Sequence, residues 1–223
     1  MRAAVFSGGT IDPEVVLPII REGHPDYVIA ADRGILFCDR YGIKPDRIVG
    51  DFDSLAEADG DDAAALLAHY REEGVPIERF NPVKDTTDTA IAINSAMQSG
   101  ADEIWFFGVT GTRADHTLSN IFDLYRLREK GITGVIMDVH NRITMPIGSE
   151  MKLLKKEQYG NWLSLFPVRG EVTGVTLEGT KYPLKDATLV QGDGGLTVSN
   201  EITADVCTIR WKSGALLVME TKD

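Results

Sequence analysis

Short apolar runs alternate with amphipathic stretches over about the first 140 residues, and this alternation constrains the fold more than any other feature. Such alternation is typical of strands joined by crossover helices in a parallel sheet. We expect strands at residues 3–6, 27–31, 47–50, 76–80, 103–109 and 134–139. The sequence therefore predicts an α/β N-terminal domain with a mostly parallel sheet.

Two of the amphipathic stretches carry apolar residues at helical spacing and end at a glycine. The first stripe consists of Ala90, Ile93 and Met97, before Gly100. The second consists of Leu118, Ile121, Phe122 and Tyr125, before Gly131. We interpret both stretches as ordinary crossover helices.

The pattern changes from about Arg142 onward, because no long helical period survives and Gly, Pro and Asp turns separate short apolar segments. These segments lie at residues 162–166, 172–177, 207–211 and 215–219. They predict an all-β C-terminal domain, in which the charged stretch at 152–158 is a helical turn or an exposed connection. We place the two domains at residues 1–142 and 143–223.

The acidic balance of the chain disfavours some partners. Its 34 acidic and 23 basic residues contrast with the basic face that phosphate contacts to nucleic acid require. No segment approaches the roughly twenty apolar residues of a membrane span, and the first residues are interpreted as a strand and not a signal peptide. Cys38 and Cys207 lie far apart, with no metal-ligand or disulfide spacing. We therefore expect a cytoplasmic protein that binds neither nucleic acid nor a membrane.

Four carboxylates fall in two short segments, Gly50-Asp51-Phe52-Asp53-Ser54 and Lys84-Asp85-Thr86-Thr87-Asp88. Two unit charges about 4 Å apart repel by roughly 4 kcal/mol at an effective dielectric near 20, so such crowding favours a bound cation. Asp51 and Asp53 would point to the same side of an extended segment, with Phe52 as a buried anchor between them. These segments predict Mg²⁺ and a phosphorylated ligand, and the alternative is acids that face solvent or cap a helix.

The unusual polar motifs all follow predicted strand ends. They occupy residues 7–10, 32–34, 51–53, 84–88 and 110–116. Because ligands bind at the carboxyl ends of the strands in open parallel sheets, we expect these motifs to converge on one rim. Neither a Gly-x-Gly-x-x-Gly motif nor a P-loop is present, which disfavours a dinucleotide dehydrogenase and a P-loop kinase.

Several of these residues also have structural interpretations. Asp85 lies three residues before Asp88, which is the spacing of an N-cap and its N3 partner, although the adjacent Lys84 favours a metal and phosphate site. Arg113 presents a planar fork that suits phosphate oxygens. Asp115 also suits a helix cap, and the histidine after it suits a structural hydrogen-bond donor.

As a set, these motifs resemble the thiamine pyrophosphokinase family. The similarity rests on Asp32-Arg33-Gly34 and on residues 50–54, 84–88, 111–116, 179–184 and 198–201, in the family's order and at similar spacing. It spans nearly the whole chain.

The resemblance implies an α/β catalytic domain, a C-terminal β-sandwich, a homodimer, and transfer of a diphosphoryl group from ATP to the hydroxyethyl group of thiamine. The other product is AMP. The implied Mg²⁺ ligands are Asp51, Asp53, Asp85 and Asp88, which together with Lys84 are the expected catalytic residues. The implied ATP contacts are Asp32, Arg113, Asp115 and His116. Thiamine is expected at the dimer interface, near Tyr182, Ser199 and Asn200.

Attack of an alcohol at the β-phosphorus needs mainly alignment and charge neutralisation. The residues alone do not choose the proton acceptor among Asp51, Asp85 and Asp88. The acidic rim by itself also suits a metal-dependent phosphohydrolase or a diphosphokinase for another alcohol, and a non-catalytic nucleotide or thiamine sensor is a further alternative. A hydrolase needs no pocket for a second substrate, whereas the segments around Tyr182 and Ser199-Asn200 in the β-rich half suggest one. They therefore favour an enzyme with two substrates over a hydrolase.

Overall fold

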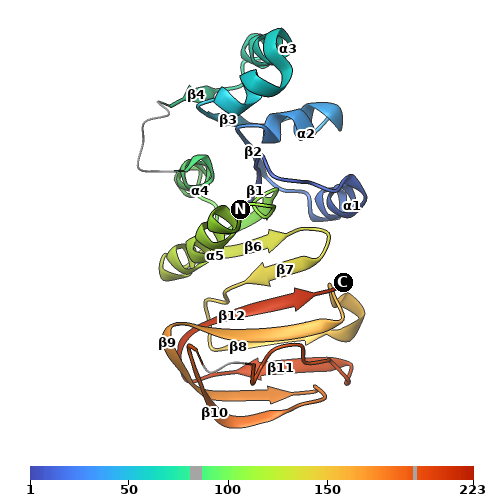
Figure 1. Cartoon of the computed structure of the whole chain (residues 1–223), viewed down its shortest axis with the longest axis vertical. Coiled ribbons are helices and arrows are strands. Elements are labelled where there is room, and N and C mark those ends of the chain that lie inside the picture. Colours follow the sequence, from blue (N-terminus) through green and yellow to red (C-terminus); the bar gives the residue numbers. More distant parts are fainter. Residues whose placement is uncertain (81–86, 193–194) are drawn as a thin grey trace. The chain divides into compact units, whose positions relative to one another are not determined.

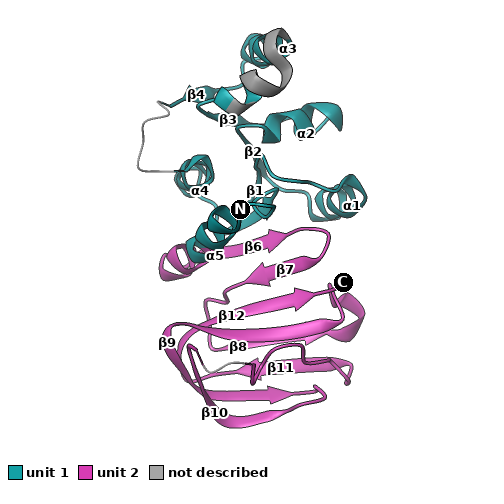
Figure 2. Cartoon of the chain, in the orientation of Figure 1, with its two compact units in different colours: residues 1–123 teal, residues 124–223 magenta. Residues whose placement is uncertain are grey.

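The computed structural model describes residues 1–80, 87–192 and 195–223, without the side chains of residues 54 and 56–61. The chain divides into two compact units, Met1–Asp123 and Leu124–Asp223 (Figure 2). Helix α5 (Ala114–Glu129) begins in the first unit and ends in the second. The units divide earlier in the chain than the domain boundary at 142–143, which stays a prediction.

Within its described residues, the first unit contains five parallel strands in the order β4-β3-β2-β1-β5 (Figure 1). They are β1 (Arg2–Phe6), β2 (Tyr27–Ala31), β3 (Arg47–Gly50), β4 (Ile77–Arg79) and β5 (Glu103–Phe107). The residues from Ala3 to Phe6 are fully buried, which explains why β1 is a continuous apolar run. The predicted parallel sheet is confirmed, although β4 and β5 are shorter than expected.

The connections between these strands are helical. They are α1 (Pro13–Gly23), α2 (Gly34–Arg40), α3 (Asp53–Glu72) and α4 (Asp88–Gln98). Helix α1 begins where the side chain of Asp12 accepts a hydrogen bond from the Glu14 amide at 2.8 Å, with a proline at its first position. Of its predicted apolar stripe, helix α4 buries Ile93, whereas Ala90 and Met97 are only partly buried. The crossover helices hold the carboxyl ends of the strands at one edge.

The predicted stripe of α5 is wrong, although the helix itself is confirmed. Leu118 and Phe122 are 51% and 53% exposed. The buried positions are instead Asn120, Leu124 and Leu127. The helix has apolar residues on more than one side, so its apolar spacing alone did not identify the buried face.

The second unit is antiparallel. Its strands are β6 (Thr133–Met137), β7 (Asn141–Thr144), β8 (Glu150–Leu154), β9 (Trp162–Glu178), β10 (Leu184–Val190), β11 (Val206–Arg210) and β12 (Ser213–Thr221). They run in the order β6-β7-β12-β9-β11-β8, and β10 pairs with β9. The sequence did not predict β7, β8 or β10. The charged stretch at 152–158 contains the end of β8 and the 3-10 helix η1 (Lys155–Glu157), and β8 buries only Leu153, as an edge strand can.

Strand β9 joins the two halves of this unit. Its first half, from Trp162 to Val168, pairs with β12, and its second half pairs with β10 and β11. The separate strands expected at 162–166 and 172–177 are therefore one strand. Between the two halves lies an apolar core that includes Leu165, Leu177 and Trp211. The predicted fold class, a parallel α/β sheet followed by an antiparallel β-rich region, is confirmed.

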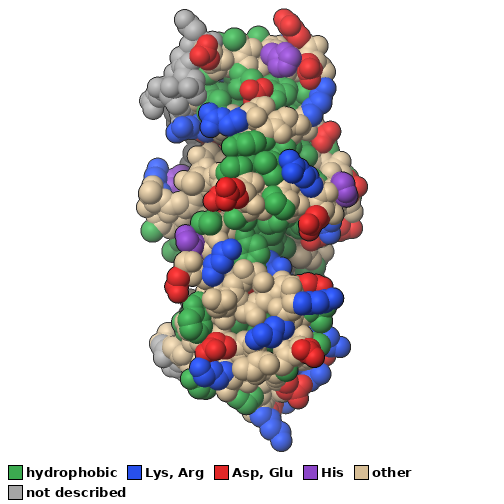
Figure 3. Space-filling view, turned by 90° about the vertical axis from the view of Figure 1, so that its right-hand side faces the viewer, with side chains coloured by type: hydrophobic (Ala, Val, Ile, Leu, Met, Phe, Trp, Pro, Cys, Tyr) green, Lys and Arg blue, Asp and Glu red, His purple; other side chains and the backbone are tan. Residues whose placement is uncertain are grey.

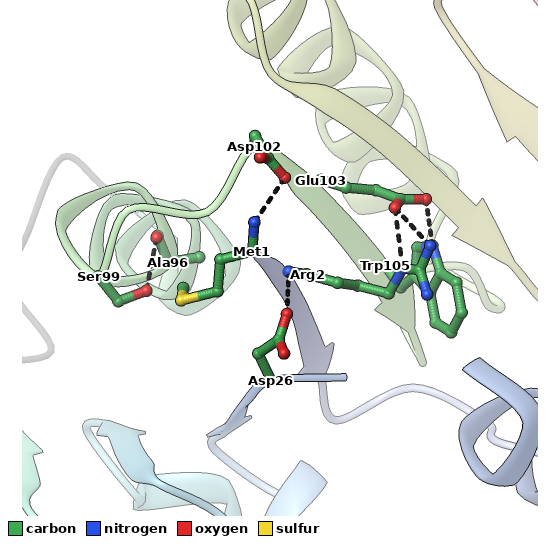
Figure 4. Close-up of polar contacts among 8 residues, drawn as sticks. All are labelled: Met1, Arg2, Asp26, Ala96, Ser99, Asp102, Glu103 and Trp105. Atoms are coloured by element: carbon green, nitrogen blue, oxygen red, sulfur yellow. Dashed lines mark hydrogen bonds and ion pairs between the residues drawn. The ribbon is translucent and has the colours of Figure 1, made fainter. Parts of the chain in front are cut away.

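Polar contacts tie the amino ends of β1 and β5 together (Figure 4). The amino group of Met1 pairs with Asp102 at 2.9 Å, and Arg2 Nε donates to Glu103 at 2.8 Å. The same guanidinium lies 4.3 Å from the centre of the Trp105 ring and donates to the Gly23 carbonyl at 2.7 Å. These contacts are at the amino ends of the strands, so the carboxyl ends remain available for a ligand site.

Basic and acidic side chains are interspersed on the face drawn in Figure 3. In the described part of the chain, no helix has both the length and the apolar character needed to cross a membrane.

Candidate active site

A cavity of about 420 Å³ opens at the carboxyl ends of β1, β2 and β5. Its described lining comes from five segments of the sequence. They are residues 7–9, residues 32–33, residues 87–89, residues 108–113, and the three residues His116, Thr117 and Asn120. The predicted convergence on one rim therefore holds for Asp32, Asp88, Arg113 and His116. Among the described residues, Asp51, Asp53 and Asp115 are not part of this lining.

Close backbone packing forms one wall of the cavity. The amide of Ser7 donates to the Phe107 carbonyl, and the amide of Gly9 donates to the Gly108 carbonyl, both at 2.8 Å. A Cβ atom on Gly9 would lie 2.5 Å from the Gly108 oxygen, and one on Gly34 would lie 2.0 Å from the Phe6 oxygen. These glycines therefore allow the loops after β1, β2 and β5 to approach each other.

Asp32 lies between the β1 and β3 loops in an uncommon backbone conformation. Its φ is 48°, in the left-handed region that Asp tolerates better than most residues. Its amide donates to the Val49 carbonyl at 2.8 Å, and its carboxylate oxygen lies 3.7 Å from the position of a Cβ on Gly8. Tertiary contacts thus hold the Asp32 carboxylate beside the glycine loop.

The segment that carries Asp51 and Asp53 is not extended, so the expectation about its geometry was wrong. Phe52 takes a φ of 63°, and Asp53 is the first residue of α3. The Asp51 carboxylate accepts a hydrogen bond from the Asp53 amide at 3.1 Å. The expected anchor is confirmed, because Phe52 is only 3% exposed. Burial of the Phe52 ring fixes a turn in which the Asp51 carboxylate is hydrogen-bonded to the backbone amide of Asp53.

The start of α4 brings a further acid to the cavity. The N-cap is Thr87, whose hydroxyl accepts a hydrogen bond from the Ala90 amide at 3.2 Å. Capping by Asp85 is therefore not the explanation of this motif, and Lys84 and Asp85 lie outside the described residues. Asp88 follows Thr87 and lines the cavity.

Two buried polar contacts support the cavity wall, and the sequence did not single them out. The hydroxyls of Ser7 and Thr89 lie 3.0 Å apart and join the β1 loop to α4. The amide group of Asn120 donates to the Val109 carbonyl at 2.7 Å and holds the β5 loop against α5. The signal for Asn120 was its spacing of four residues from His116, which places both on one side of the helix.

Arg113 and Asp115 form an exposed pair at the mouth of the cavity. The Arg113 guanidinium donates to both carboxylate oxygens, at 2.6 and 3.2 Å. This hydrogen bonding lowers the pKa of Asp115 to about 2. The same carboxylate accepts a hydrogen bond from the His116 amide at 3.0 Å, so Asp115 supports the first turn of α5. Asp115 thus positions Arg113 and the helix start, while Arg113 and His116 line the cavity.

The residues expected to contact thiamine lie together in the second unit. Asn200 is buried, and its side-chain oxygen accepts from the amides of Tyr182 and Glu201 at 3.0 and 2.9 Å. Its nitrogen donates to the Tyr182 carbonyl at 2.8 Å. The amide of Ser199 donates to the Ser164 hydroxyl at 3.0 Å. Asn200 therefore fixes the backbone of Tyr182, whose side chain is 60% exposed.

The fold and the cavity are those of an α/β enzyme with its ligand site at the carboxyl ends of parallel strands. Residues 23–136 match the family model for the thiamin pyrophosphokinase catalytic domain, and residues 150–216 match the model for the thiamin pyrophosphokinase vitamin B1 binding domain. A curated thiamine pyrophosphokinase of Bacillus subtilis (strain 168) is 32% identical over 198 residues, which cover 87% of each chain. The chain belongs to the thiamin pyrophosphokinase family, as its motifs predicted.

Solved structures agree with this assignment. The crystal structure of thiamine pyrophosphokinase from Bacillus subtilis aligns over 100% of both chains, with a TM-score of 0.84 and 27% identity. That of thiamin pyrophosphokinase from Geobacillus thermodenitrificans aligns over 100% of this chain and 98% of its own, with a TM-score of 0.84 and 26% identity. The similarity therefore includes both compact units.

Proposed function

We propose that the described cavity of this thiamine diphosphokinase binds the phosphate chain of ATP. The enzyme transfers a diphosphoryl group from ATP to the hydroxyethyl group of thiamine, and it releases thiamine diphosphate and AMP. The observation that supports the cavity assignment is the convergence of Arg113 with the glycine loop of residues 8–9 on one opening. Guanidinium groups bind phosphate oxygens readily in proteins, and glycines let a ligand approach the backbone closely because they carry no side chain.

We assign the nucleotide contacts to Asp32, Arg113 and His116, with Asp115 as the residue that positions Arg113. Arg113 stays protonated at any pH at which the protein is folded, so it can offset charge as AMP leaves. His116 lines the same opening and can donate to a phosphate oxygen or to the nucleoside. The walls formed by the Ser7–Thr89 and Asn120–Val109 contacts keep these groups in place.

We assign Mg²⁺ binding and the catalytic charge to Asp51, Asp53, Asp85 and Asp88, together with Lys84. Carboxylate oxygens are the donors that Mg²⁺ prefers, and this donor chemistry supports the assignment. The described residues contain no group of three acidic, histidine or cysteine side chains that could already hold a metal ion. When bound by these carboxylates, Mg²⁺ would neutralise negative charge on the transferred phosphoryl groups. Asp51 orders the backbone of Asp53 through its hydrogen bond, and the proton of the thiamine alcohol goes to one of Asp51, Asp85 and Asp88.

We place thiamine against Tyr182, Ser199 and Asn200, at the interface of a homodimer. These residues lie within the part of the chain that matches the vitamin B1 binding model. Exposed apolar side chains support an interface, because Leu118 and Phe122 are separated by one helical turn and are each about half exposed. The two free cysteines are both buried, in keeping with the cytoplasmic setting that we propose.

The experiment follows both products in a reaction of the protein with ATP, thiamine and Mg²⁺. We expect equal amounts of AMP and thiamine diphosphate, and no turnover after a chelator removes Mg²⁺. Asp53→Asn should lose most activity and keep its unfolding midpoint, whereas the matched control Asp62→Asn, on an exposed position of the same helix, should keep both. Full activity of Asp53→Asn would remove that residue from the metal site, and free phosphate as the main product would contradict the assigned reaction.

A further inference from the structure

Arg33, in the loop after β2, lines the opening that we assign to the ATP phosphates. It lies directly after the left-handed Asp32 and at the N-cap of α2. Its Cβ atom lies 3.4 Å from the position that a Cβ on Gly8 would occupy. We propose that Arg33 binds the phosphate chain of the nucleotide and sets the preference for a polyphosphate ligand, an inference that rests on the proposed function.

The backbone of Arg33 is held firmly, while its side chain is exposed. Its carbonyl accepts a hydrogen bond from the Leu36 amide at 3.1 Å. The next residue, Gly34, is buried against the carboxyl end of β1. The side chain therefore starts from a fixed point on the cavity wall and can bind a ligand with little backbone rearrangement.

Arg33 and Arg113, which both line the cavity, differ in their hydrogen-bond partners within the protein. Both carboxylate oxygens of Asp115 accept hydrogen bonds from Arg113. Arg33 has no ion pair or side-chain hydrogen bond with the part of the protein that the structure describes. Its guanidinium consequently has its full set of donors available, and it adds positive charge beside the carboxylate of Asp32.

The chemistry of guanidinium explains why the ligand is a chain of phosphates. A planar fork can donate to two oxygens of one phosphate or bridge two neighbouring phosphates, whereas an ammonium group acts as a point charge. The uncharged nucleoside offers no comparable partner. Arg33 should therefore contribute to the affinity for ATP and for inorganic triphosphate, but not to the affinity for adenosine.

Calorimetric titration of the whole protein in the presence of Mg²⁺ tests this assignment. Hydrogen bonds to charged groups have net values that correspond to about 10- to 100-fold in affinity. We expect Arg33→Ala to weaken binding of ATP and of inorganic triphosphate by that factor and to leave adenosine binding within about twofold. Arg33→Lys should recover only part of the loss. The control Arg40→Ala, at the exposed end of the same helix and outside the cavity, should bind all three ligands normally.

Two results would overturn the inference: normal ATP binding by Arg33→Ala at an unchanged unfolding midpoint, or an equal loss of ATP and adenosine. Failure of the wild-type protein to form thiamine diphosphate, together with ATP binding that still depends on Arg33, would uphold the inference and remove the proposed function. Normal formation of thiamine diphosphate, together with ATP binding that does not depend on Arg33, would uphold the proposed function and overturn the inference about Arg33.

Discussion

Replacement of Gly9 by alanine should damage both the stability of the protein and its cavity, whereas the same change at Gly8 should not. A Cβ on Gly9 would lie 2.5 Å from the Gly108 oxygen and 2.7 Å from the Thr110 oxygen, and both are backbone atoms. The nearest atom to a Cβ on Gly8 lies 3.4 Å away, in the Arg33 side chain. The two substitutions are therefore chemically identical and differ mainly in the space available.

The magnitude follows from the displacement that Gly9→Ala requires. To reach the clearance found at Gly8, the Gly108 carbonyl must retreat by about 0.9 Å. That carbonyl also accepts a hydrogen bond from the Gly9 amide at 2.8 Å, so the same movement lengthens and weakens this hydrogen bond. Overpacking costs about 1–3 kcal/mol and a weakened hydrogen bond about 1 kcal/mol more, which together predict a loss of about 2–4 kcal/mol.

Urea denaturation at 25 °C, followed by tryptophan fluorescence, measures this difference. Gly8→Ala should remain within about 1 kcal/mol of the wild-type free energy of unfolding, because alanine also restricts the unfolded chain. Gly9→Ala should in addition lower kcat/KM for ATP, since the β1 and β5 loops form the cavity wall. Equal stability and equal activity of the two variants would refute the reasoning from close backbone approach.

Three further predictions concern other parts of the structure. NMR titration should find the pKa of Asp115 near 2, so its contribution to stability is present above about pH 3.9 and is lost as the pH falls toward 2; Arg113→Ala should raise this pKa, and an unchanged value would rule out the pair. Asn200→Ala should lower the free energy of unfolding by about 1–3 kcal/mol because the hydrogen bonds of its buried side chain to the Tyr182 amide and carbonyl are lost; chemical denaturation equal to wild type would contradict this. Burial raises the pKa of Cys207 to about 11, so a thiol reagent should not modify it at pH 8 until urea unfolds the protein, and rapid modification of the native protein would show that the thiol is accessible.

The sequence predicted the parallel sheet well because its central strands β1, β2 and β3 are buried almost throughout. Continuous apolar runs such as Ala3 to Phe6 have few alternatives to a central strand. The β-rich half was harder, because β8 carries charged residues and buries only Leu153. In α5 the periodicity identified a helix but not its buried face, which depends on packing partners that are distant in sequence.

In the candidate site, too, the sequence predicted the features that follow from local pattern and missed those that depend on tertiary contacts. The rule that ligands bind at the carboxyl ends of parallel strands placed Asp32, Asp88 and Arg113 at one opening. The sequence did not predict the left-handed turn at Phe52, because tertiary burial of the ring determines it. Nor did it predict the hydrogen bonds between the Asn200 side chain and the Tyr182 backbone, which join segments eighteen residues apart.

Isotopic labelling of ATP tests the central claim most directly. ATP labelled with ³²P at the α, β or γ position is incubated in turn with the protein, Mg²⁺ and thiamine, and the products are separated. If the protein transfers an intact diphosphoryl group, the β and γ labels appear in thiamine diphosphate and the α label appears in AMP. Transfer of the γ label alone, with ADP as the nucleotide product, would contradict the account.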